Sequence, residues 1–400
     1  MLDVAKRPHT PALPFDRDLL DRLMDEAGID IALTTSKHNV QYLMGGHRTF
    51  FFDYMDAMGP SRYLPVLAYP KGAPEQASYV GHGSEGFQHA LNPFWTPEVH
   101  TKSTGSIASM QWTIEQLKKR DLKPRRIGVE LPFLPADALL LLQKSFPDSE
   151  IVDSLLVLER LRARKTPEEL RKLRHATDTV VDCMLAVIEG HGPGATKQEM
   201  VDALRREETN RGLLFEYCLI TAGTSLNRAP SPQKWNKGDI LSIDSGGNYH
   251  GYIGDICRMA IQGEPDAELE EMLGEIETIQ RAAMKAIKPG AIGAEVYEAA
   301  VPLLDKSKWT DHLDFLAHGM GLVSHESPRL TNRTRDPYKP QDARVPLEAR
   351  MVLSVETTLN HPRRGFIKLE DTVAVTETGH EVYGDRARGW TRDGAKAAAR

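Results

Sequence analysis

The stretch LSIDSGGNYHGYIGDICRMA, residues 241–260, decides the fold because it reads as two short strands folded back on one another. A cluster of glycine and asparagine separates the two apolar arms, which is typical of a tight turn. Each arm carries one carboxylate, Asp244 on the first and Asp255 on the second. If these two aspartates oppose each other, the turn centres on Tyr249 and His250 and both carboxylates project to one face. Negative charge on a half-buried sheet is unfavourable unless it is compensated, so the pair needs a partner.

A second hairpin repeats this arrangement. MVLSVETTLNHPRRGFIKLEDTVAV, residues 351–375, has apolar strands on both arms. Placing Glu356 opposite Glu370 centres the turn on Arg363, inside the polar NHPRRG segment. An isolated acid in a strand usually faces solvent, but four acids on sheet faces repel one another unless they hold cations. Hard oxygen ligands suit divalent metals such as manganese.

A nitrogen ligand is available between the two hairpins. FLAHGMGLVSHESP places His318 and His325 seven residues apart, with Gly319 and Gly321 allowing close approach of the backbone to a ligand. Oxygen-rich sites with one imidazole are typical of paired-metal hydrolases, in which two ions activate a shared water. The joint pattern therefore predicts a dinuclear hydrolytic centre.

Composition limits the other possibilities. A chain of 400 residues and 44.6 kDa is expected to form two domains. A net charge of −6 and a pI of about 6.2 argue against nucleic acid as a partner. Three widely spaced cysteines indicate neither a disulfide framework nor a structural zinc, which fits a reducing compartment. The start has no apolar signal segment and no later stretch has 18 uninterrupted apolar residues, so we expect a cytoplasmic protein with no membrane partner.

The chain changes character near residue 160. Residues 1–160 alternate helical and strand patterns and predict a smaller α/β domain, and residues 161–400 predict an α+β domain. The second part opens on a helix with Thr166 as N-cap, Pro167 at the first helical position and Glu169 completing a capping box. Further expected elements are helices at 265–288 and 293–307 and strands at 239–246, 252–260, 351–359 and 366–376.

At these residues the sequence resembles the pita-bread metallopeptidase family, which includes methionine aminopeptidase, Xaa-Pro aminopeptidase, prolidase and creatinase. The matching stretches are GDILSIDSGGNYHGYIGDICRM, HGMGLVSHESP, MVLSVETTL and IKLEDTVAVTETGHE. They span about 165–385 and form a highly specific ordered set. The resemblance implies a C-terminal pita-bread domain, here 161–400, preceded by a creatinase-like N-terminal domain, here 1–160.

The resemblance also implies roles for individual residues. Asp244 would bind one metal, Asp255 and Glu370 would bridge both, and His318 and Glu356 would complete the second ion. His325 falls where the family has a second histidine that contacts substrate. Glu356 is also implied to be the general base for a bridging water or hydroxide. The implied cofactor is two divalent ions, with manganese favoured and cobalt, zinc or iron open, and a homodimer is implied as well.

Two positions depart from the family pattern. The family usually has a histidine eleven residues before Gly238, where this chain has Asn227, which can hydrogen-bond but cannot titrate. The basic residue two before Glu370 is usually arginine and is Lys368 here, which cannot bind a carboxylate through two parallel hydrogen bonds. The metal ligands therefore match while the substrate side differs.

Three functions stay open on these grounds. The leading one is Xaa-Pro dipeptidase-like or aminopeptidase-like hydrolysis of an amide or imide bond in a small peptide. The second keeps the metals but acts on a small non-peptide substrate, as in creatinase-like C–N hydrolysis or a dimethylsulfoniopropionate-type lyase. The third is a non-catalytic binding protein. The aromatic residues at 50–54 could line the substrate pocket, although packing is the favoured explanation.

Overall fold

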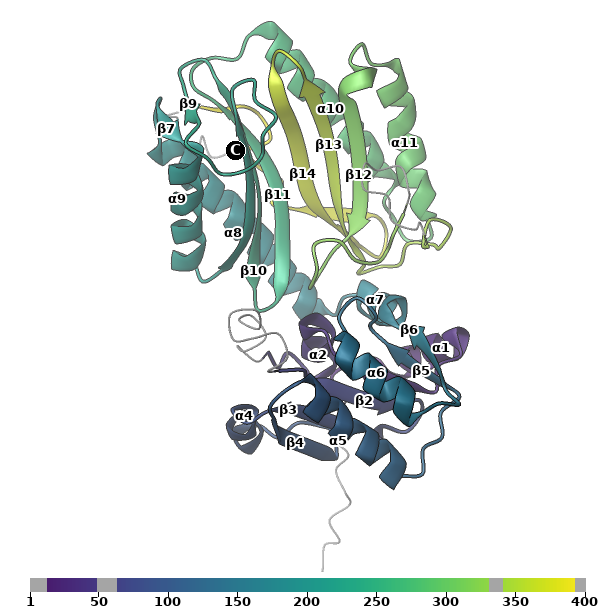
Figure 1. The fold of residues 1–400 in the computed structure, drawn as a ribbon. Helices are drawn as coiled ribbons and strands as arrows, with labels where there is room; N and C mark the ends of the chain where they lie inside the picture. The colour runs from purple at the N-terminus through teal and green to yellow at the C-terminus, as the bar shows by residue number, and fades with distance from the viewer. Residues whose placement is uncertain (1–12, 49–62, 331–340, 393–400) are drawn as a thin grey trace, which may run out of the picture. The chain divides into compact units, whose positions relative to one another are not determined.

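The computed structural model describes residues 13–48, 63–330 and 341–392 (Figure 1). The chain divides into two compact units, Met1–Arg162 and Ala163–Arg400. The boundary expected from the sequence, 160/161, is two residues away from this division. Among the helices in the described residues, none has the length and continuous apolar character that a membrane span requires. The aromatic residues at 50–54 lie outside the described ranges.

The first unit is a mixed sheet between two layers of helices. Its strand order is β4-β3-β2-β1-β5-β6, with bounds Ile31–Thr34 (β1), Val66–Pro70 (β2), Ser78–His82 (β3), Glu98–Ser103 (β4), Arg126–Val129 (β5) and Glu150–Asp153 (β6). Its helices are Arg17–Ala27 (α1), Lys37–Leu43 (α2), Glu85–Leu91 (α4), Ser106–Lys119 (α5), Ala136–Ser145 (α6) and Leu155–Ala163 (α7), with a 3₁₀ turn at Pro74–Gln76.

Alternate residues of the central strands feed two separate cores in this unit. Ala32 of β1 packs in a cluster with α1, whereas Ile31 and Leu33 pack in a cluster with α5 and α6. Since successive side chains of a strand point to opposite faces, helices must cover both sides of the sheet. The predicted smaller α/β domain is confirmed.

The second unit is built on a mostly antiparallel sheet with strand order β12-β13-β14-β11-β10-β8, with β15 paired to β14 and β16 to β11. The strands are Leu214–Ala222 (β8), Ile240–Tyr249 (β10), Tyr252–Ile261 (β11), Leu313–Gly319 (β12), Val352–His361 (β13), Gly365–Val375 (β14), His380–Tyr383 (β15) and Thr391–Arg392 (β16). Two short strands, Ala195–Thr196 (β7) and Lys234–Trp235 (β9), pair with each other.

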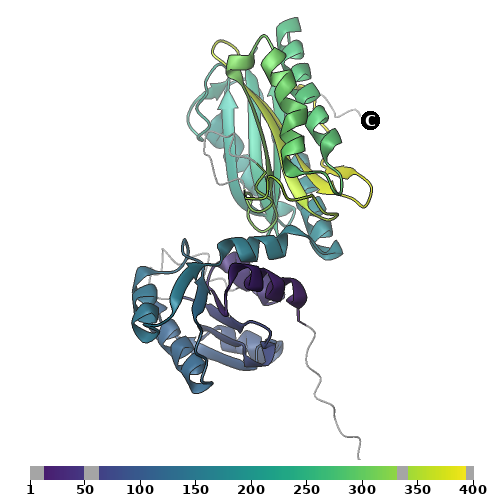
Figure 2. The same ribbon diagram turned by 90° about the vertical axis from the view of Figure 1, so that its right-hand side faces the viewer.

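Within the described residues of this unit, the helices that lie against the sheet are Pro167–Gly190 (α8), Lys197–Asn210 (α9), Ala267–Ala286 (α10) and Gly293–Lys306 (α11). A 3₁₀ turn at Thr310–His312 precedes β12. The helix α8 begins as predicted, with Thr166 accepting from the Glu169 amide and the Glu169 carboxylate accepting from the Thr166 amide. Figure 2 shows the green helices α10 and α11 against one side of the sheet. An antiparallel sheet with its helices packed against it confirms the predicted α+β class for this unit.

The two hairpins that carry the predicted ligands meet in the middle of the sheet. Strands β10 and β11 form one hairpin, β13 and β14 form the other, and β14 lies beside β11 (Figure 1). In the described part of the chain, the β11–β14 register consists of the single pair Cys257 and Glu370. In the described sheet, one residue pair therefore joins the two hairpins.

Candidate metal centre

The β10–β11 hairpin brings Asp244 and Asp255 to one face of the sheet, but not directly opposite one another. Asp244 lies opposite Cys257, and Asp255 lies opposite Gly246. The predicted register is therefore wrong by two residues. Because side chains alternate with a period of two, a shift of two leaves both carboxylates on the same face.

The register differs because the turn lies one residue later than predicted. Tyr249 pairs with Tyr252, so His250 and Gly251 form the turn. Both have positive φ, 51° and 95°, which is the requirement of a two-residue type I′ hairpin turn. The Asn248 side chain accepts a hydrogen bond from the Gly251 amide at 2.7 Å and supports this turn.

The β13–β14 hairpin has the predicted register. Glu356 lies opposite Glu370, and His361 lies opposite Gly365, so the turn centres on Arg363. The Glu370 carboxylate also accepts a hydrogen bond from the Ser354 hydroxyl at 2.7 Å. Both glutamates therefore project to the same face of their hairpin.

His318 lies near the end of β12 and points its ring at these glutamates. Its Nε2 is 3.8 Å from Glu356 Oε1 and 4.0 Å from Glu370 Oε1. Its Nδ1 contacts the Gly319 carbonyl at 3.2 Å, and this contact selects the tautomer that leaves the Nε2 lone pair free for a metal. The His325 ring stacks on the His318 ring, with centroids 3.7 Å apart.

Gly319 allows the close approach that the sequence suggested at this point. A Cβ built on Gly319 would lie 2.3 Å from the carbonyl carbon of Ser327, which is too close for any side chain. The segment that carries His325 therefore folds back directly onto the strand that carries His318.

The structure thus brings the five predicted ligands to one place. Ligand atoms of Asp255, His318 and Glu370 lie within 4.8 Å of one another. The ammonium of Lys368 forms ion pairs with Asp244, Glu356 and Glu370. These contacts place Asp244 and Glu356 beside the other three residues. All of these side chains are buried except that of Glu356, which is 12% exposed.

Burial and mutual repulsion dominate the electrostatics of the acids. Burial, then the neighbouring charges of Glu370 and Asp244, raise the pKa of Asp255 well above its usual value. Burial also raises the pKa of Asp244 and of Glu370, and the ammonium of Lys368 opposes this in each case. A cluster of this kind favours the binding of added positive charge.

The two histidines are neutral at physiological pH. Burial lowers the pKa of His318 to about 4, so its imidazole is available as a ligand. Burial, then the adjacent His318 ring, lower the pKa of His325 to about 3. His325 is therefore suited to hydrogen bonding with a substrate as a neutral ring.

The donor atoms fit divalent cations. Within the ranges that the structure describes, Asp255 Oδ1 and His318 Nε2 are buried and have no hydrogen-bond partner. Buried polar atoms without a partner are costly unless something binds them. Four carboxylates and one imidazole form an oxygen-rich donor set, which suits hard divalent cations.

The two departures from the family pattern have structural consequences. The side-chain oxygen of Asn227 accepts from the Ala229 amide at 3.0 Å, within its own loop. The next residue, Arg228, enters the pocket instead: its guanidinium pairs with Asp244 and lies 4.9 Å from the centroid of the Phe366 ring. The sequence analysis did not select Arg228. The sequence feature that could have pointed to it is a cationic residue directly after Asn227, where the family usually has a histidine.

The metal centre opens into a cavity of about 570 Å³. Besides ligands, its lining includes the apolar side chains of Leu219, Leu316 and Phe366 and the phenol of Tyr217. Burial, then the charge of Asp255, raise the pKa of Tyr217 well above its usual value, so this phenol keeps its proton. The cavity has room for a small molecule beside the five ligands.

Comparison with known proteins identifies the family. The model of metallopeptidase family M24 matches residues 168–377, and that of the creatinase/prolidase N-terminal domain matches residues 17–164. The chain belongs to metallopeptidase family M24, and its second unit has the pita-bread fold. It is a metallohydrolase, and its family implies divalent metal ions as cofactors.

Individual relatives match over most of their length. A Xaa-Pro dipeptidase of Lactobacillus delbrueckii is 25% identical over 92% of this chain and 95% of its own. An uncharacterized peptidase of Bacillus subtilis is 25% identical over 91% and 96%. The solved structure of a Xaa-Pro dipeptidase from Bacillus anthracis shares the fold, with a TM-score of 0.78 at 22% identity over 94% of this chain and 98% of that one.

Proposed function

We propose that the protein is a dinuclear metal-dependent hydrolase that cleaves the imide or amide bond of a small Xaa-Pro peptide. The observation that carries this proposal is the convergence of Asp255, His318 and Glu370, with buried ligand atoms within 4.8 Å of one another. The similarity to Xaa-Pro dipeptidases adds the substrate class.

Each ligand has a proposed place. Asp244 would hold one ion, His318 and Glu356 the other, and Asp255 and Glu370 would bridge them. Bound ions of this kind lower the pKa of water and polarise a carbonyl oxygen. Manganese suits the oxygen-rich donor set, with cobalt, zinc and iron as competitors.

Glu356 is the proposed general base. It is the most exposed of the five ligands and lines the cavity, so its carboxylate can reach a water molecule beside the substrate. His325, also in the cavity lining, would donate a hydrogen bond to the substrate oxygen as negative charge develops there. The carbonyl carbon must then lie between these two side chains.

Metal analysis followed by turnover tests this proposal. We expect the purified protein to bind divalent metal, to hydrolyse Xaa-Pro dipeptides with added Mn²⁺, and to lose that activity after chelation. A protein that binds no divalent ion under any of these conditions would rule the proposal out.

A second function is favoured by Arg228. A permanent guanidinium occupies the cavity near the position where peptidase relatives have a titratable histidine. Such a change is consistent with a small non-peptide substrate, including creatinase-like C–N hydrolysis or lyase chemistry. Efficient turnover across a proline dipeptide panel would count against it, whereas activity on a small amide or guanidino compound alone would support it.

A non-catalytic binding role is the least supported, since the chain keeps the expected residue type at all five proposed ligand positions. Replacing Asp255 with Asn is expected to abolish turnover under the enzymatic proposals and to leave partner binding intact under this one. We further propose a homodimer, testable by light scattering, and a cytoplasmic location. The three cysteines, Cys183, Cys218 and Cys257, are free and buried, which is consistent with a reducing compartment.

A further inference from the structure

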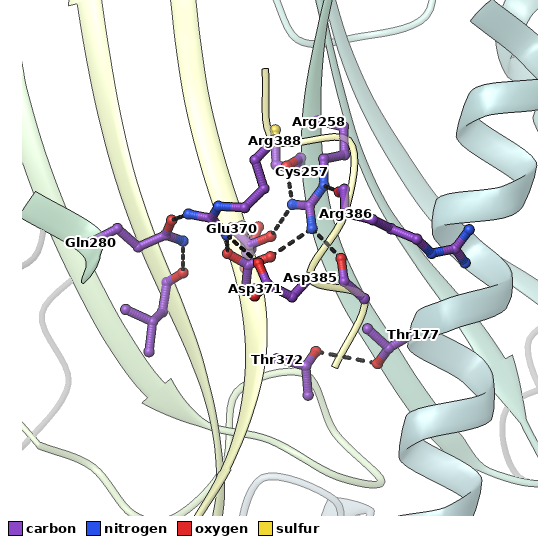
Figure 3. A network of polar contacts seen from close by, with 12 residues as sticks. Thr177, Cys257, Arg258, Gln280, Glu370, Asp371, Thr372, Asp385, Arg386 and Arg388 are labelled. Carbon is purple, nitrogen blue, oxygen red and sulfur yellow. Dashed lines mark hydrogen bonds and ion pairs between the residues drawn. The ribbon is translucent and has the colours of Figure 1, made fainter. Parts of the chain in front are cut away.

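A buried polar network surrounds Arg258 and Asp371 (Figure 3). Arg258 follows Cys257 on β11, and Asp371 follows Glu370 on β14. Because successive residues of a strand point to opposite faces, Arg258 and Asp371 project away from the ligands while sharing their backbone. Both side chains are fully buried.

Arg258 adds hydrogen bonds at the junction of the two hairpins. Its Nη1 donates to the carbonyl of Cys257 and to the carbonyl of Glu370, each at 2.8 Å. These are the two residues of the single β11–β14 pair. One guanidinium nitrogen therefore binds both strands at the point where the two ligand hairpins meet.

The remaining donors of Arg258 are also used. Its Nη2 donates to Asp371 Oδ1 and to the Gly384 carbonyl, both at 2.6 Å, and its Nε donates to the Arg386 carbonyl at 2.8 Å. All five N–H groups of the guanidinium thus have acceptors. The fork joins β11, β14 and the segment that follows β15.

Asp371 extends the network to the helix layer. Its second oxygen pairs with Arg388, which also donates to Glu277 of α10 at 2.7 Å. Burial alone would raise the pKa of Asp371, but Arg258 and Arg388 outweigh this and hold it below its usual value. Asp371 is therefore a charged anchor between two cations.

A separate pair of hydrogen bonds reaches the backbone of Asp255. The Thr372 hydroxyl donates to the Asp255 carbonyl at 3.2 Å. It also accepts a hydrogen bond from the Thr177 hydroxyl of α8 at 3.3 Å (Figure 3). Asp255 and Glu370 are thus linked through backbone contacts at Cys257, Glu370 and Thr372.

We propose that Arg258, together with Asp371, is a positioning residue that fixes the separation of the metal ligands Asp255 and Glu370. This inference rests on the proposed metal centre. Two carboxylates that hold the same ions must stand at a defined spacing, and the strands that carry them share the single pair Cys257–Glu370. Residues that hydrogen-bond to metal ligands without touching the metal typically change the metal affinity by about 10–100-fold when they are replaced.

Titration of the chelator-treated full chain with MnCl₂ in a calorimeter tests the inference. We expect Arg258→Lys to weaken Mn²⁺ binding by about 10-fold or more, because an ammonium cannot reach five acceptors arranged around a planar fork. Circular dichroism and the Tm of the metal-free protein report the fold separately. Metal affinity and metal-free stability are thus independent readouts.

Arg281→Lys is the matched control. Arg281 pairs with Asp385 in the same C-terminal segment, and both side chains are 38% exposed. Their other ion pairs are with Glu277 and Arg388, not with residues of β11 or β14. We expect its Mn²⁺ affinity to stay within about twofold of the wild type, since exposed pairs contribute little.

Asp371→Asn keeps the test decisive if Arg258→Lys does not fold. It removes the charge of the anchor but leaves the Arg258 bonds to the Cys257 and Glu370 carbonyls, so we expect a smaller loss of Mn²⁺ affinity. Folded variants that bind Mn²⁺ as tightly as the wild type would overturn the inference, whatever their Tm. Tight Mn²⁺ binding by the wild type without peptide turnover would instead count against the proposed function alone.

Discussion

Asp244 and Asp255 differ in how their buried charge is compensated. Asp244 Oδ2 pairs with Lys368 at 2.7 Å and also with Arg228. In the described structure Asp255 Oδ1 has no hydrogen-bond partner. Of the two hairpin aspartates, Asp255 therefore depends more on a bound cation, which agrees with its proposed bridging position.

Replacing Glu356 with Gln tests the proposed general base. The amide keeps the size of the side chain but cannot accept a proton, so kcat is expected to fall by about 10²-fold or more. The measurement is steady-state turnover of a Xaa-Pro dipeptide, with metal content determined alongside. Glu348→Gln is the control, because that side chain is 56% exposed and pairs with Arg164. Equal loss in both variants would contradict the assignment.

Glu208 predicts a pH dependence of stability that is independent of catalysis. Burial raises its pKa from 4.5 to about 8, and the Ser245 hydroxyl, which donates to it at 3.1 Å, only partly offsets this. Between pH 4.5 and 8 the folded chain keeps a proton that the unfolded chain releases. The contribution of Glu208 to stability is therefore complete below pH 4.5 and is lost as the pH rises towards 8.

Glu208→Gln should remove this loss. Relative to that of the wild type, the free energy of unfolding of the variant is expected to rise by about 2 kcal/mol from acidic to mildly alkaline pH. Each pKa unit is worth about 1.4 kcal/mol, and the full pKa shift sets the upper limit of this change. Denaturant unfolding at both pH values measures it. Glu207→Gln, at the neighbouring and only half-buried residue that pairs with Arg211, is the control on the same helix. A pH-independent difference for Glu208→Gln would refute the prediction.

The close packing of α8 against β11 can be tested by a single substitution. A Cβ built on Gly254 of β11 would lie 2.5 Å from the Thr177 amide nitrogen of α8. Gly254→Ala must therefore push the helix away from the strand, and overpacking of this kind typically costs about 1–3 kcal/mol. Thermal unfolding checks the expected loss.

Gly274→Ala provides the opposite expectation in another element. Gly274 lies on the exposed side of α10, and a Cβ there would meet nothing within 4 Å. Since alanine favours a helix over glycine by up to about 1 kcal/mol, this variant should be slightly stabilised. If both substitutions destabilised to the same degree, steric contact at Gly254 would not be the cause.

For the whole molecule, metal binding should be linked to stability. The ligands lie on three separate strand regions, β10–β11, β12 and β13–β14, and the acids among them repel one another when buried together. An ion that binds only the folded chain stabilises it by about 2.7 kcal/mol at a free concentration 100 times its Kd. Chelation should therefore lower the Tm, and added Mn²⁺ should restore it.

Magnesium serves as the control for that experiment, because it prefers to keep its waters and octahedral geometry. If Mg²⁺ restored the Tm as well as Mn²⁺ does, the stabilisation would be a general ionic effect. An unchanged Tm after complete metal removal would show that the acidic cluster is stable without cations, contrary to the expectation from its buried charge.

The sequence by itself determined the face of each ligand and one of the two registers. Apolar alternation with a period of two placed Asp244 with Asp255 and Glu356 with Glu370, and the polar turn at Arg363 set the second hairpin. The helix start at Thr166 was also readable, since a capping box is local. These features depend on residues close together in the chain.

Only the tertiary structure decided the rest. The first hairpin turns at His250, a non-glycine residue with positive φ, so its local pattern did not reveal the register. The entry of Arg228 into the cavity and the bonds from Arg258 to Glu370 join residues far apart in sequence, which no local periodicity encodes. The physical reason is that side-chain alternation selects a face, whereas packing between distant strands selects which residues meet across it.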